Sequence, residues 1–420
     1  MMMTDFYGGI DFGTTNSSAA LSEAGNIPFM VPLEGQDITV PTALFFGDNQ
    51  KVSFGREAMR RYMLGEQGRC MRSIKRILGT SLMSSGTLVN GRFVKFEDIL
   101  KCFLRYIKQR MDETAQECVD NVVMGRPVHF RDNDADGDVR AENELRQAAK
   151  NIGFVNVEFQ YEPIAAAFAH EAILDEEKLA CVIDIGGGTS DFTIIRLGPK
   201  HISKSNREDD ILASTGVRIG GNDFDKELAL KSFMPELGMY TTYGNKSLFV
   251  PTSQYFELSE WSSVNNLYSY QNFRIVNEVL IQAHEPDKYS RLREVMEKER
   301  GHNLLAETEA FKIALTTNAL HSAQLSFLDD KPEIVVCADD FEAAINWEMK
   351  KLEQVLEECL TQAGVDADKI ELIVLTGGST EIPILQRKVS QLFPLAKLSQ
   401  DNKLASVGLG LAYDSRRRFG

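Results

Sequence analysis

The chain alternates between short apolar runs typical of strands and apolar residues at helical spacing. Residues 7–21 read as a strand, a tight Gly–Thr turn and a second strand. Further strands are expected at 121–130, 155–161, 179–185, 334–337 and 371–375. Helices are expected at 101–118, 142–152, 164–173, 288–300, 305–320, 340–363 and 406–413. This alternation predicts an α/β architecture.

One segment repeats far along the chain. Residues 8–21, GGIDFGTTNSSAAL, and residues 181–195, CVIDIGGGTSDFTII, share an apolar strand, an Asp, a Gly-rich turn with Thr and a second strand. Asp11 and Asp184 are the equivalent acids. A repeat at this spacing predicts two similar lobes.

The chemistry of these hairpins suits a phosphate chain. Glycine lets the backbone come close to phosphate oxygens, and backbone N–H groups with Thr hydroxyls supply neutral donors. An Asp at the end of the strand is placed to face Mg²⁺, usually through water, because Mg²⁺ keeps most of its hydration shell. Two facing hairpins therefore predict a clamp for a polyphosphate.

The overall charge limits the partners. The formal net charge is −15, which repels nucleic acid and anionic membranes, so a polyanionic ligand needs a local binding device. Six scattered cysteines without a CxxC pair fit reduced thiols. With no secretory signal and no apolar run of transmembrane length, we expect a cytoplasmic protein that contacts neither nucleic acid nor membrane.

The motifs resemble those of one family, the 70-kDa heat-shock (DnaK) chaperones, over essentially the whole chain. The similarity is to their nucleotide-binding domain, and more closely to the short YegD-like branch. Six motifs carry the resemblance, in the order of the family: GIDFGTTNS (9–17), SIKRILG (73–79), YEPIAAAFAH (161–170), VIDIGGGTSDFTII (182–195), RIGGNDFD (218–225) and LTGGSTEIP (375–383).

The resemblance implies a two-lobed actin-like ATPase fold with duplicated ribonuclease-H-like subdomains. Lobe I would span 1–178, with a helix in 396–420 returning to it and a subdomain at about 39–118. Lobe II would span 179–395, with a subdomain at about 223–329. The implied ligands are ATP or ADP with Mg²⁺.

The resemblance also implies roles for matching residues. Asp11 and Asp184 would hold the metal, Lys75 would reach the γ-phosphate, and Glu162 would hold the water network around the metal. Thr189 and Asp191 would complete a catalytic set of Lys75, Glu162, Asp184, Thr189 and Asp191. The implied nucleotide-binding residues are Gly13, Thr14, Thr15, Asn16, Gly187, Gly188, Gly220, Gly221, Glu309, Lys312, Thr316, Gly377, Gly378 and Ser379.

The sequence departs from the family pattern at informative positions. Two arginines that sandwich adenine in other members are Ile313 and Glu381 here, and losing each contact weakens adenine binding by ~0.5–2 kcal/mol. The arginine that engages J-domain cochaperones aligns with Glu158, which puts that coupling in doubt. Because the sequence stops at Gly420, we also expect it to lack the peptide-binding domain. We therefore expect a weak Mg²⁺-dependent ATPase whose lobe closure is read by an unidentified protein.

Two other functions stay open. DIGGGTS is close to the exopolyphosphatase pattern, so a small-molecule or polyphosphate phosphotransferase or phosphatase of the same superfamily is one alternative. A catalytically silent nucleotide-binding scaffold is the other, suggested by Ile313 and Glu381. Residues 132–143 match the first eight positions of a calcium loop but carry Asn143 where a bidentate Glu is needed, so no calcium site is expected.

Overall fold

The computed structural model describes residues 6–24, 26–48, 51–131, 134–171, 174–201, 204, 207–399 and 405–420. Contacts divide the chain into two compact units. The first comprises Met1–Gly220, Lys351–Thr380 and Leu385–Gly420, and the second Gly221–Lys350 with Glu381–Ile384. The predicted lobe boundary near residue 178 falls inside the first unit and stays a prediction.

The larger sheet of the first unit has the strand order β11-β10-β1-β2-β3, with β4 pairing β2 as well. Strand β1 runs antiparallel to β2 and parallel to β10, which is in turn parallel to β11. The bounds are Phe6–Phe12 (β1), Asn16–Glu23 (β2), Phe29–Met30 (β3), Thr39–Pro41 (β4), Asn121–Arg126 (β10) and Asn156–Tyr161 (β11).

The second sheet repeats this topology in the order β14-β13-β12-β19-β20. Strand β12 is antiparallel to β13 and parallel to β19, and β19 is parallel to β20, so β12 and β13 correspond to β1 and β2. The bounds are Lys178–Ile185 (β12), Ser190–Leu197 (β13), Ile211–Val217 (β14), Leu372–Thr376 (β19) and Lys397–Leu398 (β20). The duplication expected from the two hairpins is therefore present in the sheets.

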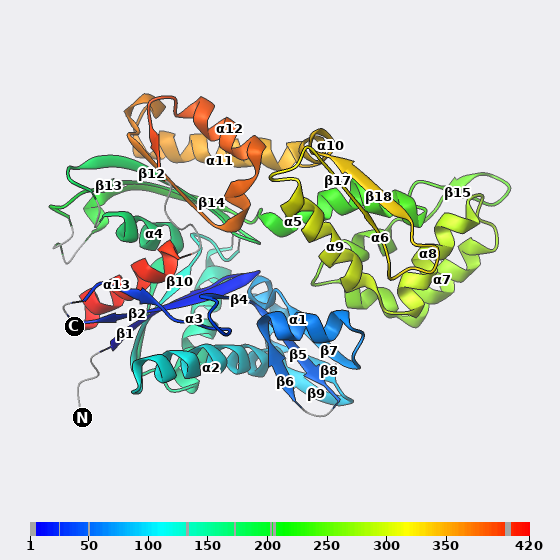
Figure 1. Cartoon of the computed structure of the whole chain (residues 1–420), viewed down its shortest axis with the longest axis horizontal. Helices are drawn as coiled ribbons and strands as arrows, with labels where there is room; N and C mark the ends of the chain where they lie inside the picture. Colours follow the sequence, from blue (N-terminus) through cyan, green and yellow to red (C-terminus); the bar gives the residue numbers. More distant parts are fainter. Residues whose placement is uncertain are drawn as a thin grey trace. The chain divides into compact units, whose positions relative to one another are not determined.

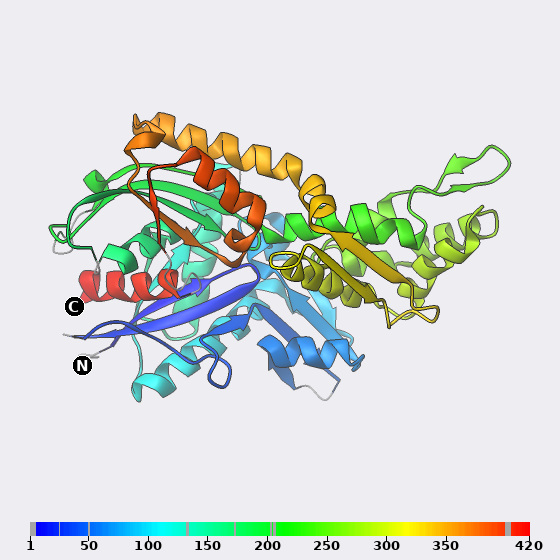
Figure 2. The same cartoon turned by 45° about the horizontal axis from the view of Figure 1, so that its top comes forward.

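Two helices lie between these sheets (Figures 1 and 2). They are α4 (Glu162–Glu171) and α13 (Ser406–Phe419), and their apolar residues share one core with β10, β12, β13 and β19. The helices come unusually close to each other and to β1. A Cβ on Gly410 would lie 1.7 Å from Ala165 O, and one on Gly9 would lie 2.2 Å from Ala412 N. Only glycine permits such backbone contact.

The remaining elements of the first unit surround this centre. A second core packs around α2, which buries the helically spaced residues Phe103, Leu104, Ile107 and Met111. The other bounds are Ala43–Gly47 (β5), Val52–Phe54 (β6), Gly55–Met63 (α1), Gly68–Arg72 (β7), Gly86–Val89 (β8), Arg92–Lys95 (β9), Phe96–Ala115 (α2) and Ala135–Asn151 (α3). Two further helices, α11 (Asn346–Ala363) and α12 (Pro383–Leu392), flank β19 in sequence.

The second unit is mainly helical, with two small hairpins. Its helix bounds are Gly221–Leu228 (α5), Ser253–Leu258 (α6), Tyr270–Leu280 (α7), Pro286–Glu297 (α8), Gly301–Ala314 (α9) and Ala338–Ala344 (α10). The strands are Thr242–Tyr243 (β15), Leu248–Phe249 (β16), Leu320–Gln324 (β17) and Glu333–Cys337 (β18). The single helix expected at 340–363 is two helices, α10 and α11, which are separated at Ile345. Among the described residues, no helix combines the length and apolar character needed to cross a membrane.

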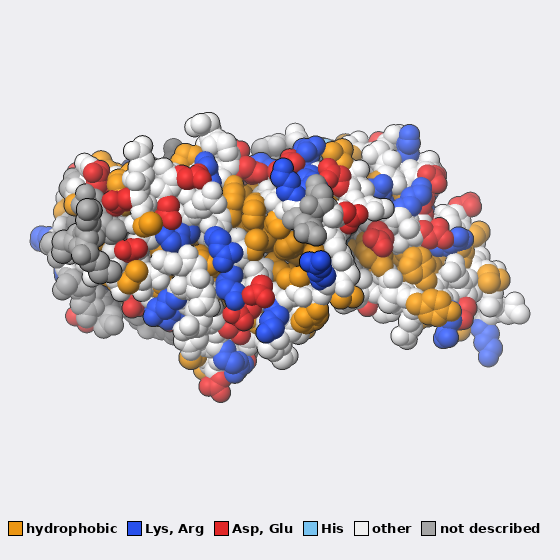
Figure 3. Space-filling model, turned by 90° about the horizontal axis from the view of Figure 1, so that it is seen from below, with side chains coloured by type: hydrophobic (Ala, Val, Ile, Leu, Met, Phe, Trp, Pro, Cys, Tyr) orange, Lys and Arg blue, Asp and Glu red, His pale blue; other side chains and the backbone are white. Residues whose placement is uncertain are grey.

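The aromatic-rich stretch 240–273 is only partly core. Tyr255 and Trp261 are buried. Phe249 and Tyr270 are 73% and 84% exposed. Figure 3 shows hydrophobic side chains at the surface of this unit. Aromatic content alone therefore does not indicate which side chains of this stretch are covered.

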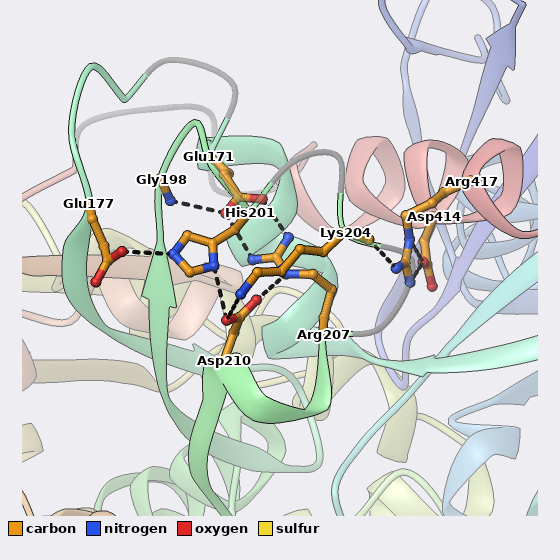
Figure 4. A network of polar contacts seen from close by, with 9 residues as sticks. All are labelled: Glu171, Glu177, Gly198, His201, Lys204, Arg207, Asp210, Asp414 and Arg417. Carbon is orange, nitrogen blue, oxygen red and sulfur yellow. Dashed lines mark hydrogen bonds and ion pairs between the residues drawn. The ribbon is translucent and has the colours of Figure 1, made fainter.

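A buried ionic network holds the end of α4 against the segment that follows β13 (Figure 4). Arg207 donates two hydrogen bonds to Glu171, at 2.6 and 2.8 Å, and its Nε donates to Asp210 Oδ2 at 2.7 Å. All three side chains are at most 4% exposed. Glu171 Oε1 also accepts from the backbone N–H of Gly198 at 3.0 Å.

The network continues outward on both sides (Figure 4). His201 lies 3.0 Å from Glu177 and 2.9 Å from Asp210, and Lys204 Nζ donates to Asp210 at 2.7 Å. Arg417 on α13 donates to the carbonyl oxygen of Lys204 and to its own neighbour Asp414. Charged side chains thus join α4, α13 and the described residues between β13 and β14.

Arg207→Ala removes the central cation and leaves Glu171 buried without its bidentate partner. Breaking a buried pair in this way costs about 3–5 kcal/mol. We expect the free energy of unfolding, measured by urea denaturation, to fall by that amount. The control is Arg274→Ala, because Arg274 pairs with Glu278 at the surface and its removal costs at most about 1 kcal/mol. Equal losses in the two variants would contradict a structural role for the network.

Candidate functional site

Two glycine turns meet inside the first unit. Turn 1, residues 13–15, joins β1 to β2, and turn 2, residues 186–189, joins β12 to β13. A Cβ on Gly187 would lie 2.2 Å from Thr15 Cγ2, and one on Gly188 would lie 2.9 Å from Thr14 Oγ1. The two hairpins, 173 residues apart at their Asp residues 11 and 184, are therefore in contact at their tips.

Turn 1 is anchored through its carbonyl groups. The Thr42 hydroxyl donates to Gly13 O and the Thr42 N–H donates to Thr15 O, both at 2.8 Å. Ser17 Oγ lies 2.8 Å from the same Thr42 hydroxyl. Because these bonds use the oxygen atoms of the turn, they do not consume its N–H groups. Asn16, the next residue, is exposed at the start of β2.

Turn 2 is held by two more glycine segments. Gly186 N donates to Thr189 O at 3.0 Å, which closes the turn, and Ser379 Oγ donates to Gly186 O at 3.4 Å. A Cβ on Gly220 would lie 2.6 Å from Gly188 N. Gly377 has a φ of +81°, and a Cβ there would lie 3.0 Å from Asp184 Oδ1. Four of the predicted glycine segments thus converge, and a side chain has no room at Gly187, Gly220 or Gly377.

A buried lysine lies beside the turns. Ser73 adopts a left-handed φ of 59°, which starts a short 3-10 helix, Ile74–Ile77, and places Lys75 inside the protein. Lys75 Nζ donates to Glu162 Oε1 at 2.6 Å, and both side chains are at least 90% buried. Glu162 is the first residue of α4 and packs against Gly125, where a Cβ would lie 3.0 Å from Glu162 Cγ.

Three aspartates complete the charged cluster. Asp184 and Asp191 are directly opposite on β12 and β13, and Asp11 is near the end of β1. Asp191 Oδ1 accepts from Val128 N at 2.8 Å, whereas its Oδ2 is buried and has no hydrogen-bond partner among the described residues. The catalytic residues predicted from the sequence are therefore gathered, with Thr189 in the turn between these strands.

Burial and mutual repulsion control the protonation of this cluster. Burial, and then the charge of Glu162, raise the pKa of Asp11 to about 7 and that of Asp191 to about 8. The pKa of Asp184 is raised well above its usual value for the same two reasons. Burial alone would lower the pKa of Lys75, but Glu162 and Asp11 outweigh it, and the pKa is raised. Lys75 therefore stays cationic.

The cluster fits a hydrated divalent cation. It combines four carboxyl groups with one ammonium group, and burying such an excess of negative charge is costly without a further cation. The orphaned Asp191 Oδ2 marks the same imbalance. Within the described ranges, no three His, Cys, Asp or Glu side chains are arranged to ligate a metal directly. Contact through water and phosphate oxygens is the mode that Mg²⁺ prefers.

Four predicted nucleotide-binding residues belong to the second unit. Lys312 Nζ lies 2.9 Å from Asp225 Oδ2 and donates to Gly221 O at 3.1 Å. The Thr316 hydroxyl donates to Ile313 O at 2.7 Å, and Glu309 is half-buried on α9. Their roles toward ribose and base stay predictions. The Ile313 side chain, which stands where an arginine was expected, is 60% exposed.

The sequence analysis missed several residues of the site. Thr42 and Val128 anchor turn 1 and Asp191, and neither belongs to a motif that we singled out. Arg76 and Arg218 line a cavity beside the turns. Both lie inside motifs that we quoted, SIKRILG and RIGGNDFD. Their positive charge within these motifs could therefore have identified them as residues near the phosphate site.

The calcium-like loop has another role in its described part. Helix α3 begins at Ala135, and Asp134 Oδ1 accepts from Gly137 N at 2.8 Å as an N-cap. Asp138 accepts from Arg131 N at 2.9 Å. Asp132 and Asn133 lie outside the described residues. The described acids thus start a helix.

Known proteins with similar sequences are chaperones. A family model described as Hsp70 protein matches residues 8–238 and 268–413. The chaperone protein HscA homolog of Shewanella denitrificans is 25% identical over 97% of this chain and 58% of its own length. Chaperone protein DnaK of Metamycoplasma hominis is 25% identical over 93% of this chain and 55% of its own length.

Chaperone protein HscA of Buchnera aphidicola is 24% identical over 96% of this chain and 69% of its own length. The chain thus spans little more than half the length of the first two relatives. The family model covers far more than half of this chain, and the duplicated sheets agree with the actin-like ATPase fold of that family. The chain belongs to the Hsp70 family.

Proposed function

We propose that this protein binds Mg–ATP with the phosphates held by turns 1 and 2, and that it hydrolyses ATP slowly as a chaperone-like protein. The observation that carries the proposal is the contact between Gly187 and Thr15, with the Lys75–Glu162 pair beside it. In a chain of charge −15, backbone N–H groups and one buried lysine are the donors suited to a triphosphate.

Each part of the site has a task in this mechanism. The N–H groups of the turns and the hydroxyls of Thr14 and Thr15 would bind the β- and γ-phosphates. Asp11 and Asp184 would hold a hydrated Mg²⁺, whose charge offsets that of the phosphate oxygens. Positioning and charge stabilisation of this kind supply most of the catalysis in phosphoryl transfer.

Lys75 and the buried acids would act on the reacting groups. The ammonium group of Lys75 would lie against the γ-phosphate and stabilise the charge that develops on it. Glu162 fixes the direction of that ammonium through their 2.6 Å hydrogen bond. Asp191, whose pKa is raised to about 8, would accept a hydrogen bond from the attacking water and orient it.

The output would be a movement between nucleotide states that a partner protein reads. The relatives are named chaperones, which supports a chaperone-like role, although the chain spans about 55–58% of the first relatives. Glu158 stands where other family members carry the arginine that engages J-domain cochaperones. It is an exposed acid on β11, and its Oε2 lies 3.7 Å from Arg146 Nη1. Its negative charge does not suit a cochaperone surface that binds an arginine. We propose that a different partner is used.

Titration calorimetry with ATP tests nucleotide binding. We expect binding in Mg²⁺ and much weaker binding in EDTA, because the carboxylates repel the phosphates without the cation. Gly187→Ala forces a methyl group against Thr15, and an overpacking cost of about 1–3 kcal/mol in the phosphate site corresponds to a loss of affinity of about 5- to 150-fold. Its melting temperature without nucleotide is the control for folding. Absence of a binding signal at millimolar ATP would refute the proposal.

Lys75→Ala separates hydrolysis from binding. Removing one preorganised charge from a buried site lowers turnover by about 10²–10³-fold, whereas the turns still hold the nucleotide. Single-turnover hydrolysis and ATP affinity are the two measurements. Lys101→Ala is the matched control, because Lys101 pairs with Glu97 and Asp98 on the surface of its own helix, α2. Unchanged turnover in Lys75→Ala would remove the role given to this lysine.

The raised pKa values predict how pH affects the stability of the metal-free protein. Asp191 binds a proton more tightly when folded, so its contribution is complete below pH 3.8 and is lost as pH rises toward its folded pKa of about 8. Unfolding free energy in EDTA should therefore fall between pH 5 and 8, by at most about 1.4 kcal/mol per pH unit for this group. Asp191→Asn should make the decline shallower. A slope identical to that of the unmodified protein would refute the buried titration.

A further inference from the structure

An aromatic segment of the second unit carries few charges. Residues 239–273 contain nine aromatic residues and three charged ones, Lys246, Glu257 and Glu260, in a chain of which 25% is charged. The family model matches residues 8–238 and 268–413, so residues 239–267 lie between its two matched ranges. A partner that recognises features shared by the family is therefore not expected to depend on this segment.

The hairpin β15–β16 in this segment has an uncovered outer strand. Strand β15 pairs with β16 on one side, and Tyr243 of β15 forms an antiparallel bridge with Ala283 on the other. Strand β16 is thus at the edge. Its two residues, Leu248 and Phe249, are 54% and 73% exposed. Because successive residues of a strand point to opposite faces, both faces of β16 are open to solvent.

Two further apolar side chains extend this surface. Tyr240, which precedes β15, is 59% exposed, and Ile281, which follows α7 and lies two residues before the bridge at Ala283, is 84% exposed. We call Tyr240, Leu248, Phe249 and Ile281 the hairpin surface. Figures 1 and 2 show the hairpin at one end of the second unit. Adjoining apolar side chains of this size, with few charges among them, are typical of a protein–protein interface.

Two charged residues at the border of the hairpin surface suit a reciprocal contact. Lys246 lies in the turn between β15 and β16, is exposed, and forms no ion pair with the described residues. Glu278 lies one helical turn before Ile281, and its side chain is 66% exposed in a pair with Arg274 at 3.5 Å. Such a surface pair is weak. Under a twofold axis each copy can offer its lysine to the glutamate of the other, so the surface is complementary to itself.

We propose that the hairpin surface joins two copies of this chain in a symmetric dimer. Leu248 and Phe249 pack against the same residues of the second copy. Lys246 of each copy pairs with Glu278 of the other. Two chains of net charge −15 repel each other, and a surface poor in charge is where this repulsion is smallest. Lys246 and Pro251 flank β16 and discourage the addition of a further strand, so side chains make the contact.

Sedimentation equilibrium of the full chain without nucleotide tests the dimer. We expect association that depends on concentration. Phe249→Ser should weaken it by at least about tenfold, because an aromatic anchor is lost from both copies. The matched control is Phe93→Ser, since Phe93 is 63% exposed on another hairpin, on strand β9. Its dissociation constant should equal that of the unmodified chain, and both variants should keep the melting temperature.

Two results of this experiment would overturn the dimer. One is a chain that stays monomeric up to ~1 mM. The other is equal weakening by Phe249→Ser and Phe93→Ser, because association would then not use the hairpin surface.

Exchanging charges tests the reciprocal pairing. Lys246→Glu and Glu278→Lys each place like charges across the interface, and each should weaken association several-fold. The double variant restores opposite charges and the original net charge, and it should associate nearly as well as the unmodified chain. Glu278→Lys alone makes the chain less negative, so stronger association of this variant would show that net charge, and not the pairing, controls the contact. A double variant no better than the single ones would also overturn the pairing.

A lipid surface is the other occupant that an apolar hairpin with one lysine could take. Flotation with vesicles of phosphatidylcholine separates the two, in the unmodified chain and in Phe249→Ser. We expect neither chain to float. A monomeric chain that floats, and that loses this binding in Phe249→Ser, would overturn the dimer and assign the surface to lipid. Failure of the dimer leaves the proposed ATPase function standing, because the hairpin surface contains no residue of turn 1, turn 2 or the Lys75–Glu162 pair.

Discussion

Close contact between the glycines of turn 2 and the threonine side chains of turn 1 is the constraint on which this site depends. Gly187 meets Thr15 and Gly188 meets Thr14 so closely that neither glycine can carry a side chain. The two sheets are arranged so that the tips of their hairpins meet. Helices α4 and α13 fix the distance between the sheets, because they share one apolar core with both. Phosphate recognition by N–H groups requires such proximity, because a neutral donor acts only over hydrogen-bond distance.

Electrostatics then sets the chemical character of the site. Asp11, Asp184 and Asp191 are forced into one buried region, where desolvation raises their pKa values, and the ammonium group of Lys75 offsets only part of the charge. A cation bound with phosphate would relieve this imbalance, so ligand binding and the stability of the site are linked.

The sequence predicted the parts of this structure that are encoded locally. An Asp, a Gly-rich turn and flanking strands recur in both halves, so the duplication could be predicted from the sequence. The predicted Hsp70 family and actin-like fold are confirmed. Strands of two to five residues, such as β3 and β6, span too few residues for alternation to identify them. Thr42 and Val128 act through chain segments brought in by tertiary packing, which no local pattern reveals. The exposure of Tyr270 was likewise decided by which face of α7 is covered.

The position of α13 has a consequence for how this protein is made. This helix contacts β1 through Gly9 and α4 through Gly410, and it supplies Leu411 to the core shared by both sheets. The first strand therefore packs against a helix about four hundred residues later in the chain. In small domains, contacts between residues so far apart in sequence slow folding strongly. During synthesis the parts of β1 and α4 that α13 covers lack that partner until the helix has been made. A protein of a chaperone family is thus itself expected to need protection by a chaperone while it is being translated.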